Sequence, residues 1–177
     1  MSSTMTISAA VAPVYKEASF TSEMITQGLM WESVSILSKK DNWCRVTMED
    51  GYEGWMHYFY LSEPQIDSQN SLILTNRCTP IRSQRGKDGQ ILTLLSFGTT
   101  VSILEKTSGY CRIQLCNGEE GFIPAQQEIV QQNRNDIIKL AIYLTGVPYL
   151  WGGKSSFGYD CSGFVQMVMK TAGISIS

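Results

Sequence analysis

The residues with the clearest chemical potential lie late in the 177-residue chain, in the segment Tyr149-Leu-Trp-Gly-Gly-Lys-Ser-Ser-Phe-Gly-Tyr-Asp-Cys-Ser-Gly-Phe164. Cys161 comes where an apolar run with helical spacing begins. Unpaired backbone N–H groups and the positive end of a helix dipole favour a thiolate at such a position. Gly152, Gly153 and Gly158 indicate a bend with unusual backbone angles. The pattern predicts a nucleophilic cysteine that attacks a carbonyl group.

Two helices are expected to position this segment. The first covers 136–145, with Asn135 or Asp136 as its N-cap and Gly146 ending it in the left-handed conformation. Its core-facing residues are expected to be Ile137, Leu140, Ala141 and Leu144. The second covers 161–172 and is closed by Gly173. Its expected apolar face is Phe164, Val165, Val168, Met169 and Ala172.

A repeat precedes the helices, because residues 34–56 match residues 101–123 at an offset of 67. Such self-similarity implies one structural unit that is used twice. Turn signals, including Asp50-Gly51 and Asn117-Gly118, separate short runs in which apolar and polar residues alternate, as in strands with one buried face. The alternation predicts that Cys44 and Cys111 are core thiols and that Cys116 is exposed.

The composition is that of a globular protein with a net charge of −2 and no basic run, which argues against nucleic-acid binding. No apolar run approaches the roughly 18 residues of a membrane span. The five cysteines have no metal-like spacing, and the N-terminus is a poor signal peptide. A reducing cytoplasm is therefore expected, with a periplasmic or secreted location as the alternative if a leader is missing.

The segment around Cys161 resembles the NlpC-type cysteine peptidases, bacterial enzymes that cut peptidoglycan stem peptides, over residues 137–174. The repeated unit resembles the bacterial SH3-like domain, whose Gly-x-x-Gly-Trp element ends here at Trp55. Together they resemble the YkfC-like γ-D-glutamyl-L-diamino-acid endopeptidases. The fold class implied is mostly β and then α+β. Its expected parts are two small SH3-like β-barrels at 9–64 and 72–127, followed by the N-terminal helical part of a papain-like catalytic domain at 133–177.

The resemblance implies that Cys161 is the nucleophile and that Tyr149 helps to hold the oxyanion. It implies that the free amine of a stem peptide beginning with L-Ala is bound by Asp160, Ser162, Glu23 and Tyr58, with Tyr60 as a substitute for Tyr58. Trp151 is expected to contact the substrate as well. No metal or organic cofactor is implied. Plain structural alternatives stay open: aromatic core for Tyr149 and Trp151, an N-cap for Asp160, and surface roles for Glu23 and Tyr58.

A peptidase of this type also needs a histidine, which the family places downstream of the cysteine. The chain contains one histidine, His57, inside the first repeat, where a surface role at a strand end is expected. We therefore expect the chain to be cut before the catalytic domain is complete, to be inactive alone, to expose the apolar faces of both helices, and to hold 133–177 loosely. The alternatives are a tandem SH3-like module that binds cell-wall peptides without catalysis, and a related amidase or acyltransferase.

Overall fold

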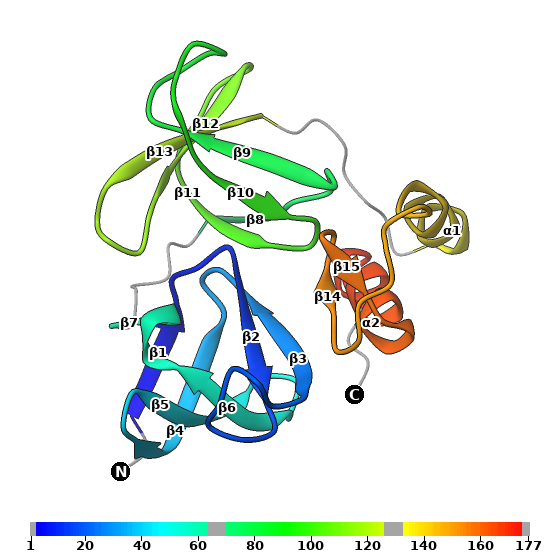
Figure 1. The fold of residues 1–177 in the computed structure, drawn as a ribbon. Coiled ribbons are helices and arrows are strands. Elements are labelled where there is room, and N and C mark those ends of the chain that lie inside the picture. Colours follow the sequence, from blue (N-terminus) through cyan, green and yellow to red (C-terminus); the bar gives the residue numbers. More distant parts are fainter. Residues whose placement is uncertain (1–2, 64–69, 126–132, 175–177) are drawn as a thin grey trace.

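The computed structural model describes residues 3–63, 70–125 and 133–174, and Figure 1 shows two curled antiparallel sheets with two helices beside them. The first sheet has the spatial order β3-β2-β6-β5-β4-β1-β7. Its strands are β1 (Ser3–Ile7), β2 (Val11–Tyr15), β3 (Met24–Leu29), β4 (Ser33–Lys40), β5 (Trp43–Met48), β6 (Glu53–His57) and β7 (Leu61–Ser62), with the short 3-10 helix η1 (Tyr58–Tyr60) before β7. We call this sheet with its loops the first module.

The second sheet has the order β10-β9-β13-β12-β11-β8, and we call it with its loops the second module. Its strands are β8 (Ser71–Ile73), β9 (Cys78–Arg82), β10 (Ile91–Ser96), β11 (Thr100–Lys106), β12 (Tyr110–Gln114) and β13 (Glu120–Pro124). The first residues of β2 to β6 and of β9 to β13 are each 67 residues apart. The repeat seen in the sequence from residue 34 therefore extends to strands that lie before it, and the expected fold class is confirmed.

Each module encloses its own core. Alternate residues of β5 and of β12 belong to these cores, as the sequence pattern predicted. Cys44 and Val46 are buried in the first core, and Cys111 and Ile113 in the second. Cys116 is not a plain exposed thiol, because it is partly buried and its Sγ donates to the carbonyl of Ile7 in the first module at 3.6 Å. The side chain therefore belongs to the contact between the modules.

The ends proposed from the sequence for the three domains, residues 64, 127 and 177, lie outside the described residues. At the other end of the first module, β1 pairs with β4 from Ser3 onward. The first sheet thus includes residues that precede position 9, where the first barrel was expected to start.

The remaining elements form what we call the cysteine segment, residues 133–174. It contains α1 (Arg134–Tyr143), α2 (Cys161–Thr171) and a hairpin of β14 (Lys154–Ser155) and β15 (Gly158–Tyr159). Asn133 caps α1, not Asn135 or Asp136, because its side chain accepts the N–H of Asp136 at 3.0 Å. Helix α1 ends at Tyr143, and Gly146 follows with a φ of +90°.

Helix α2 buries a face that is rotated from the expected one. Val165 is 45% exposed, whereas Met167, which was not assigned to the core, is 1% exposed. The reason is a tertiary contact: the turn Phe97-Gly98 of the second module lies against Met167, and a Cβ on Gly98 would collide with the Met167 methyl group. The buried row of α2 is therefore Gly163, Met167, Val168, Thr171 and Ala172.

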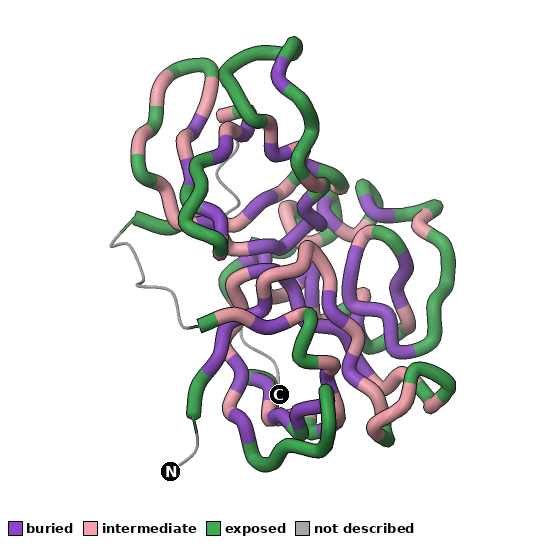
Figure 2. Tube along the Cα trace, turned by 60° about the vertical axis from the view of Figure 1, so that its left-hand side comes forward, coloured by how far each residue is buried: buried purple, intermediate pink, exposed green. Residues whose placement is uncertain are grey.

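A third core joins all the units. It holds Leu29 from the first module, Phe97 from the second, Leu140 of α1 and Met167 of α2, and Ile137 and Ala141 of α1 pack against it. The expectation that both helices expose their apolar faces is thus wrong, although Ile138 and Ile142, which lie on α1 outside its expected apolar face, are 44% and 63% exposed. Figure 2 shows buried stretches inside each sheet and again where the units meet. These contacts argue against a loosely held cysteine segment.

One turn is used twice to make these junctions. The turn after β3 carries Met30, which is buried in the core of the second module, and Trp31, which packs against that core. The equivalent turn after β10 carries Phe97 in the third core. Trp31 and Gly98 hold equivalent positions with similar left-handed φ angles of 70° and 78°. Each module therefore inserts the same turn into the unit that follows it in sequence.

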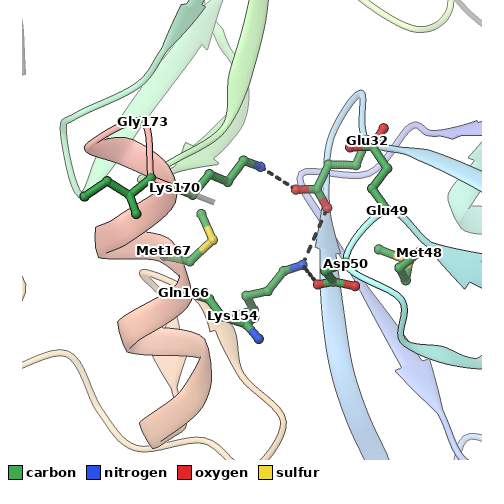
Figure 3. Close-up of a pocket in the computed structure, with 10 residues that line it drawn as sticks. Glu32, Met48, Glu49, Asp50, Lys154, Gln166, Met167, Lys170 and Gly173 are labelled. Atoms are coloured by element: carbon green, nitrogen blue, oxygen red, sulfur yellow. Dashed lines mark hydrogen bonds and ion pairs between the residues drawn. The ribbon is translucent and has the colours of Figure 1, made fainter. Parts of the chain in front are cut away.

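A cluster of charges also joins the first module to the cysteine segment (Figure 3). Lys154 Nζ lies 2.8 Å from Asp50 Oδ2 and 3.9 Å from Glu32 Oε2, and Lys170 Nζ lies 2.7 Å from Glu32 Oε1. Burial alone would raise the pKa of Glu32, but the two ammonium groups hold it below its usual value. Burial alone would lower the pKa of Lys154, but Glu32 and Asp50 hold it above its usual value.

A second polar junction ties the cysteine segment to the second module. Arg77, just before β9, donates to the carbonyl groups of Tyr143 and Thr145 at the end of α1, and its guanidinium lies 5.1 Å from the Tyr143 ring centre. Ser156 in the β14–β15 turn donates to the Arg77 carbonyl, and its N–H donates to Ser96 Oγ at 2.9 Å. The segment is therefore held by both modules.

We expect Phe97→Ala to lower the free energy of unfolding by about 3 to 5 kcal/mol, because it empties a site shared by three units. Phe59→Ala is the matched control, since Phe59 is 76% exposed and its loss is expected to cost less than about 0.5 kcal/mol. Urea unfolding of both variants makes the measurement. Equal losses would contradict a docked cysteine segment.

The charge cluster makes stability depend on pH. Glu32, whose pKa is lowered by folding, contributes stability above its unfolded pKa of about 4.3, and this is lost as pH falls through its folded pKa. Lys154, whose pKa is raised, contributes below about 10.4 and loses this as pH rises through its folded pKa. We expect acid to reduce the unfolding free energy of Glu32→Gln less steeply than that of the unchanged protein, in urea titrations from neutral to acid pH. Glu53→Gln, which breaks an exposed pair with Arg45, should leave the slope unchanged; parallel slopes for all three proteins would contradict the expectation.

Candidate active site

The loop before Cys161 is shaped by three glycines with different roles. Gly152 has a φ of +69°, and a Cβ there would lie 2.7 Å from the Met24 carbonyl oxygen, so both angle and space require glycine. Gly153 and Gly158 do not have the unusual angles that were expected. Instead, a Cβ on Gly153 would collide with the Gly158 carbonyl, and one on Gly158 would lie 2.6 Å from Leu150 Cβ. The glycines thus let the loop pack closely on itself and on the first module.

Cys161 is exposed at the first position of α2, as the sequence predicted. Asp160 is the N-cap: its Oδ1 accepts the N–H of Gly163 at 2.6 Å and the hydroxyl of Ser162 at 2.8 Å. Its Oδ2 accepts the N–H of Gly152 at 3.1 Å. One carboxylate therefore fixes the start of the helix, the orientation of Ser162 and the glycine loop.

Tyr149 and Cys161 line the same open depression, whose volume is about 380 Å³. The lining is mainly apolar and includes Val147, Phe164 and Tyr159. Burial raises the pKa of Tyr159, so its hydroxyl stays protonated at neutral pH. Tyr149 is 66% exposed, so the alternative that its ring belongs to the core does not hold.

Glu23 reaches this site from the first module. Trp151 Nε1 donates to Glu23 Oε1 at 3.1 Å, across 128 positions of sequence. The other carboxylate oxygen of Glu23 lies 3.4 Å from Lys16 Nζ. Trp151 is 62% exposed. The structure therefore brings Glu23 and Trp151 together, next to the loop that Asp160 holds.

The other aromatic candidates have their contacts inside the first module. The Tyr58 ring, 48% exposed, has Lys39 Nζ 5.6 Å from its centre, and Tyr60 packs against the first core. His57 ends β6, and its ring lies 5.1 Å and 5.2 Å from those of Phe20 and Trp43. Its Nδ1 accepts the N–H of Phe59 at 3.2 Å. These contacts agree with the expected strand-end position of His57.

The described part of the chain contains no group of three or more His, Cys, Asp or Glu residues placed to hold a metal ion. Among its helices, neither α1 nor α2 has the length and apolarity that crossing a membrane requires.

Sequence reasoning missed the residues that dock the loop. Gln27 Oε1 accepts the N–H of Lys154 at 2.9 Å, and the Lys154 ammonium meets Glu32 and Asp50. The only hint was a lysine between Gly153 and Ser155 in an otherwise small and apolar stretch. Its partners lie more than 100 positions away, and no local pattern pairs them.

Three parts of the chain match models of known families. Residues 14–58 match the bacterial dipeptidyl-peptidase SH3 domain, residues 79–127 the bacterial SH3 domain, and residues 146–177 the NlpC/P60 family. The matches cover both modules and the loop with Cys161. The resemblance inferred from the sequence is thereby confirmed.

Curated relatives match most of this chain. The chain is 31% identical over 163 residues to a γ-D-glutamyl-L-lysine dipeptidyl-peptidase of Bacillus subtilis (strain 168), covering 85% of this chain and 54% of that protein. It is 29% identical over 170 residues to the protein of the same name from Bacillus cereus (strain ATCC 10987 / NRS 248), covering 85% and 51%. The chain thus spans about half the length of these relatives.

A solved structure has the same fold. The crystal structure of an NlpC/P60 family protein from Bacillus cereus ATCC 10987 superposes with a TM-score of 0.82 at 21% identity, over 98% of this chain and 74% of that one. The arrangement of the two modules and the cysteine segment is therefore one that a known protein adopts.

We expect Cys161 to react with iodoacetamide at least about tenfold faster than Cys78 at neutral pH, because only Cys161 lies at a helix N-terminus. Cys78 is the matched control: it is also exposed, but burial raises its pKa. Mass spectrometry of peptides after timed labelling measures both rates. Labelling in denaturant should equalise them, and a Cys161 rate no greater than that of Cys78 in the folded protein would contradict an activated thiol.

Proposed function

We propose that the protein is a cysteine endopeptidase that cleaves γ-D-glutamyl–diamino-acid bonds in peptidoglycan stem peptides, because residues 146–177 match the NlpC/P60 family and follow two segments that match bacterial SH3 domains. The observation that carries the proposal is the placement of Cys161. It lies at the start of a capped helix, in one depression with Tyr149, beside a loop that contacts Glu23.

In the proposed reaction the Cys161 thiolate attacks the γ-carbonyl carbon of D-glutamate. A sulfur–carbon bond forms, and the carbonyl oxygen takes the negative charge, which Tyr149 helps to stabilise. The carbon–nitrogen bond then breaks, and the diamino acid leaves as a protonated amine. Water hydrolyses the resulting thioester and restores the thiol.

Two acidic groups at the loop that precedes Cys161 support recognition of a free amine. The carboxylates of Glu23 and Asp160 both contact the loop that precedes Cys161. An ammonium group bound between them would gain charge-assisted hydrogen bonds, which an acylated amine cannot form. We propose that these residues, with Ser162, Trp151 and Tyr58, bind the N-terminal L-Ala of a peptide already released from the glycan strand. Of these, Tyr58 has the least support, because its ring contacts lie within the first module.

The proposed reaction also needs a group that takes the proton of the Cys161 thiol and passes it to the leaving amine. The 177 residues contain one histidine, and its ring packs among Phe20 and Trp43 of the first module. We propose that a histidine outside these residues serves as the base and that the 177 residues alone bind peptide without turnover. We also propose a cytoplasmic location, since all five cysteines are free thiols.

We expect Cys161→Ala to bind the free-amine tripeptide L-Ala-γ-D-Glu-L-Lys, and Glu23→Gln in that background to weaken binding about tenfold, because one charged hydrogen bond to the ammonium is lost. N-acetylation of the peptide should weaken binding more than this, because it also removes the contact with Asp160, and it should cost less affinity in the Glu23→Gln variant than in its parent. Isothermal titration calorimetry measures all four affinities.

Glu53→Gln is the control, because Glu53 is also half-exposed and paired but belongs to β6 and contacts Arg45. It should bind both peptides like the Cys161→Ala protein. Equal affinity for the free and acetylated peptides in that protein would overturn the proposed amine recognition, and turnover by the unchanged 177-residue chain would overturn the proposed external base.

A further inference from the structure

We propose that Lys154 is a positioning residue. It aligns the loop before Cys161, residues 149–160, with strand β3 of the first module, so that Glu23 lies beside this loop. The inference rests on the proposed function only in the use it assigns to Glu23. Lys154 does not line the depression with Cys161 and Tyr149, and it acts through the backbone that it holds.

The Lys154 side chain is enclosed by groups of the first module. Its side chain is 8% exposed, and its ammonium meets Asp50 at 2.8 Å in the β5–β6 turn and Glu32 at 3.9 Å in the β3–β4 turn. Figure 3 shows Lys154 and Lys170 extending from the cysteine segment toward these two carboxylates. Glu32 is fixed in turn, because its Oε2 accepts the N–H of Leu29 at 3.0 Å. The ammonium therefore binds between two carboxylates of the first module, one of which is held in place by a backbone N–H.

Three contacts run along one strand of the first module. Glu23, just before β3, accepts from the Trp151 ring, and Gln27 within β3 accepts the N–H of Lys154. Glu32, just after β3, faces the Lys154 ammonium. A shift of the loop along this strand would break all three contacts together. The lysine thus fixes the same register that brings Glu23 to Trp151.

The position of Lys154 is transmitted to Cys161 through backbone packing. A Cβ on Gly163 would collide with the Gly153 carbonyl and lie 3.1 Å from Lys154 Cα, so the first turn of α2 rests directly on this loop. The N–H of Asp160 donates to the Gly153 carbonyl at 2.9 Å, and Lys154 pairs with Tyr159 in the β14–β15 hairpin. No flexible side chain lies between the lysine backbone and the turn that bears Cys161.

The buried ion pairs of Lys154 are better suited to selecting one alignment of the loop than to raising the free energy of unfolding. Desolvating a lysine and two carboxylates offsets much of their attraction, and a well-packed apolar contact can stabilise a junction equally well. A buried ammonium, however, is strongly unfavourable away from its partners. The cluster therefore penalises misplaced arrangements of the loop more than it lowers the free energy of the correct one.

The test uses the 177-residue chain with Lys154→Met, Lys154→Arg and the control Lys139→Met, whose lysine is exposed on α1 and pairs with Asp136. We expect Lys154→Met to speed amide hydrogen exchange in residues 149–156 about tenfold and to slow Cys161 alkylation, while exchange in β4, β5, β11 and β12 stays unchanged. Lys154→Arg keeps the charge and should restore both readouts. Lys139→Met should change neither.

Two results would overturn the proposal. In the first, Lys154→Met leaves amide exchange in residues 149–156 unchanged. In the second, Lys154→Met speeds exchange throughout the molecule and Lys154→Arg does not bring it back to the original rate. If Lys154→Met fails to fold, Asp50→Asn decides, because it removes the 2.8 Å partner and leaves Glu32 paired with Lys170. It should loosen residues 149–156 in the same direction.

A binding arm separates this proposal from the proposed function. In the Cys161→Ala background, Lys154→Met should reduce the preference for free-amine over N-acetylated L-Ala-γ-D-Glu-L-Lys. If the protein without the Lys154 change shows no preference, the proposed amine recognition fails, while the exchange measurements still decide whether Lys154 positions the loop.

Discussion

The burial of Phe97 among residues of three units is the contact on which the arrangement of the site depends. Phe97 is fully enclosed, and its neighbours include Leu29 of the first module and Met167 of α2. The second module thus supplies part of the apolar surface that α2 covers, together with Leu29 of the first module and Leu140 of α1. Without Phe97, the helix that bears Cys161 would lose the part of this surface that meets Met167.

Apolar burial holds the units together, but it does not select one alignment of them. Polar contacts select the alignment. Lys154 of the cysteine segment pairs with Asp50 of the first module, and Arg77 of the second module donates to the Tyr143 carbonyl. Directional contacts with fixed partners distinguish one register from its neighbours, whereas an apolar surface tolerates small sliding. The proposed site, which combines Glu23 and Cys161 from different units, would need such directional contacts.

Local patterns in the sequence predicted what depends on local structure. The turn pairs and the alternation around Cys44 and Cys111 identified the strands and the core, and the position of Cys161 identified the start of α2. The buried face of α2 was misplaced at Val165 and Met167, because the Phe97-Gly98 turn, not helical periodicity alone, decides which side is covered. Glu23 was found through family resemblance, and the partners of Lys154 were not found, since contacts across more than 100 positions leave no spacing to recognise.

The turn that each module inserts into the next unit has a consequence for synthesis on the ribosome. The first module emerges with Met30 and Trp31 uncovered, and they find their place only when the second module has folded. The second module then presents Phe97, which stays uncovered until the helices follow. Each folded module therefore presents the surface on which the next unit packs, and the helix that bears Cys161 can dock only after both modules have folded.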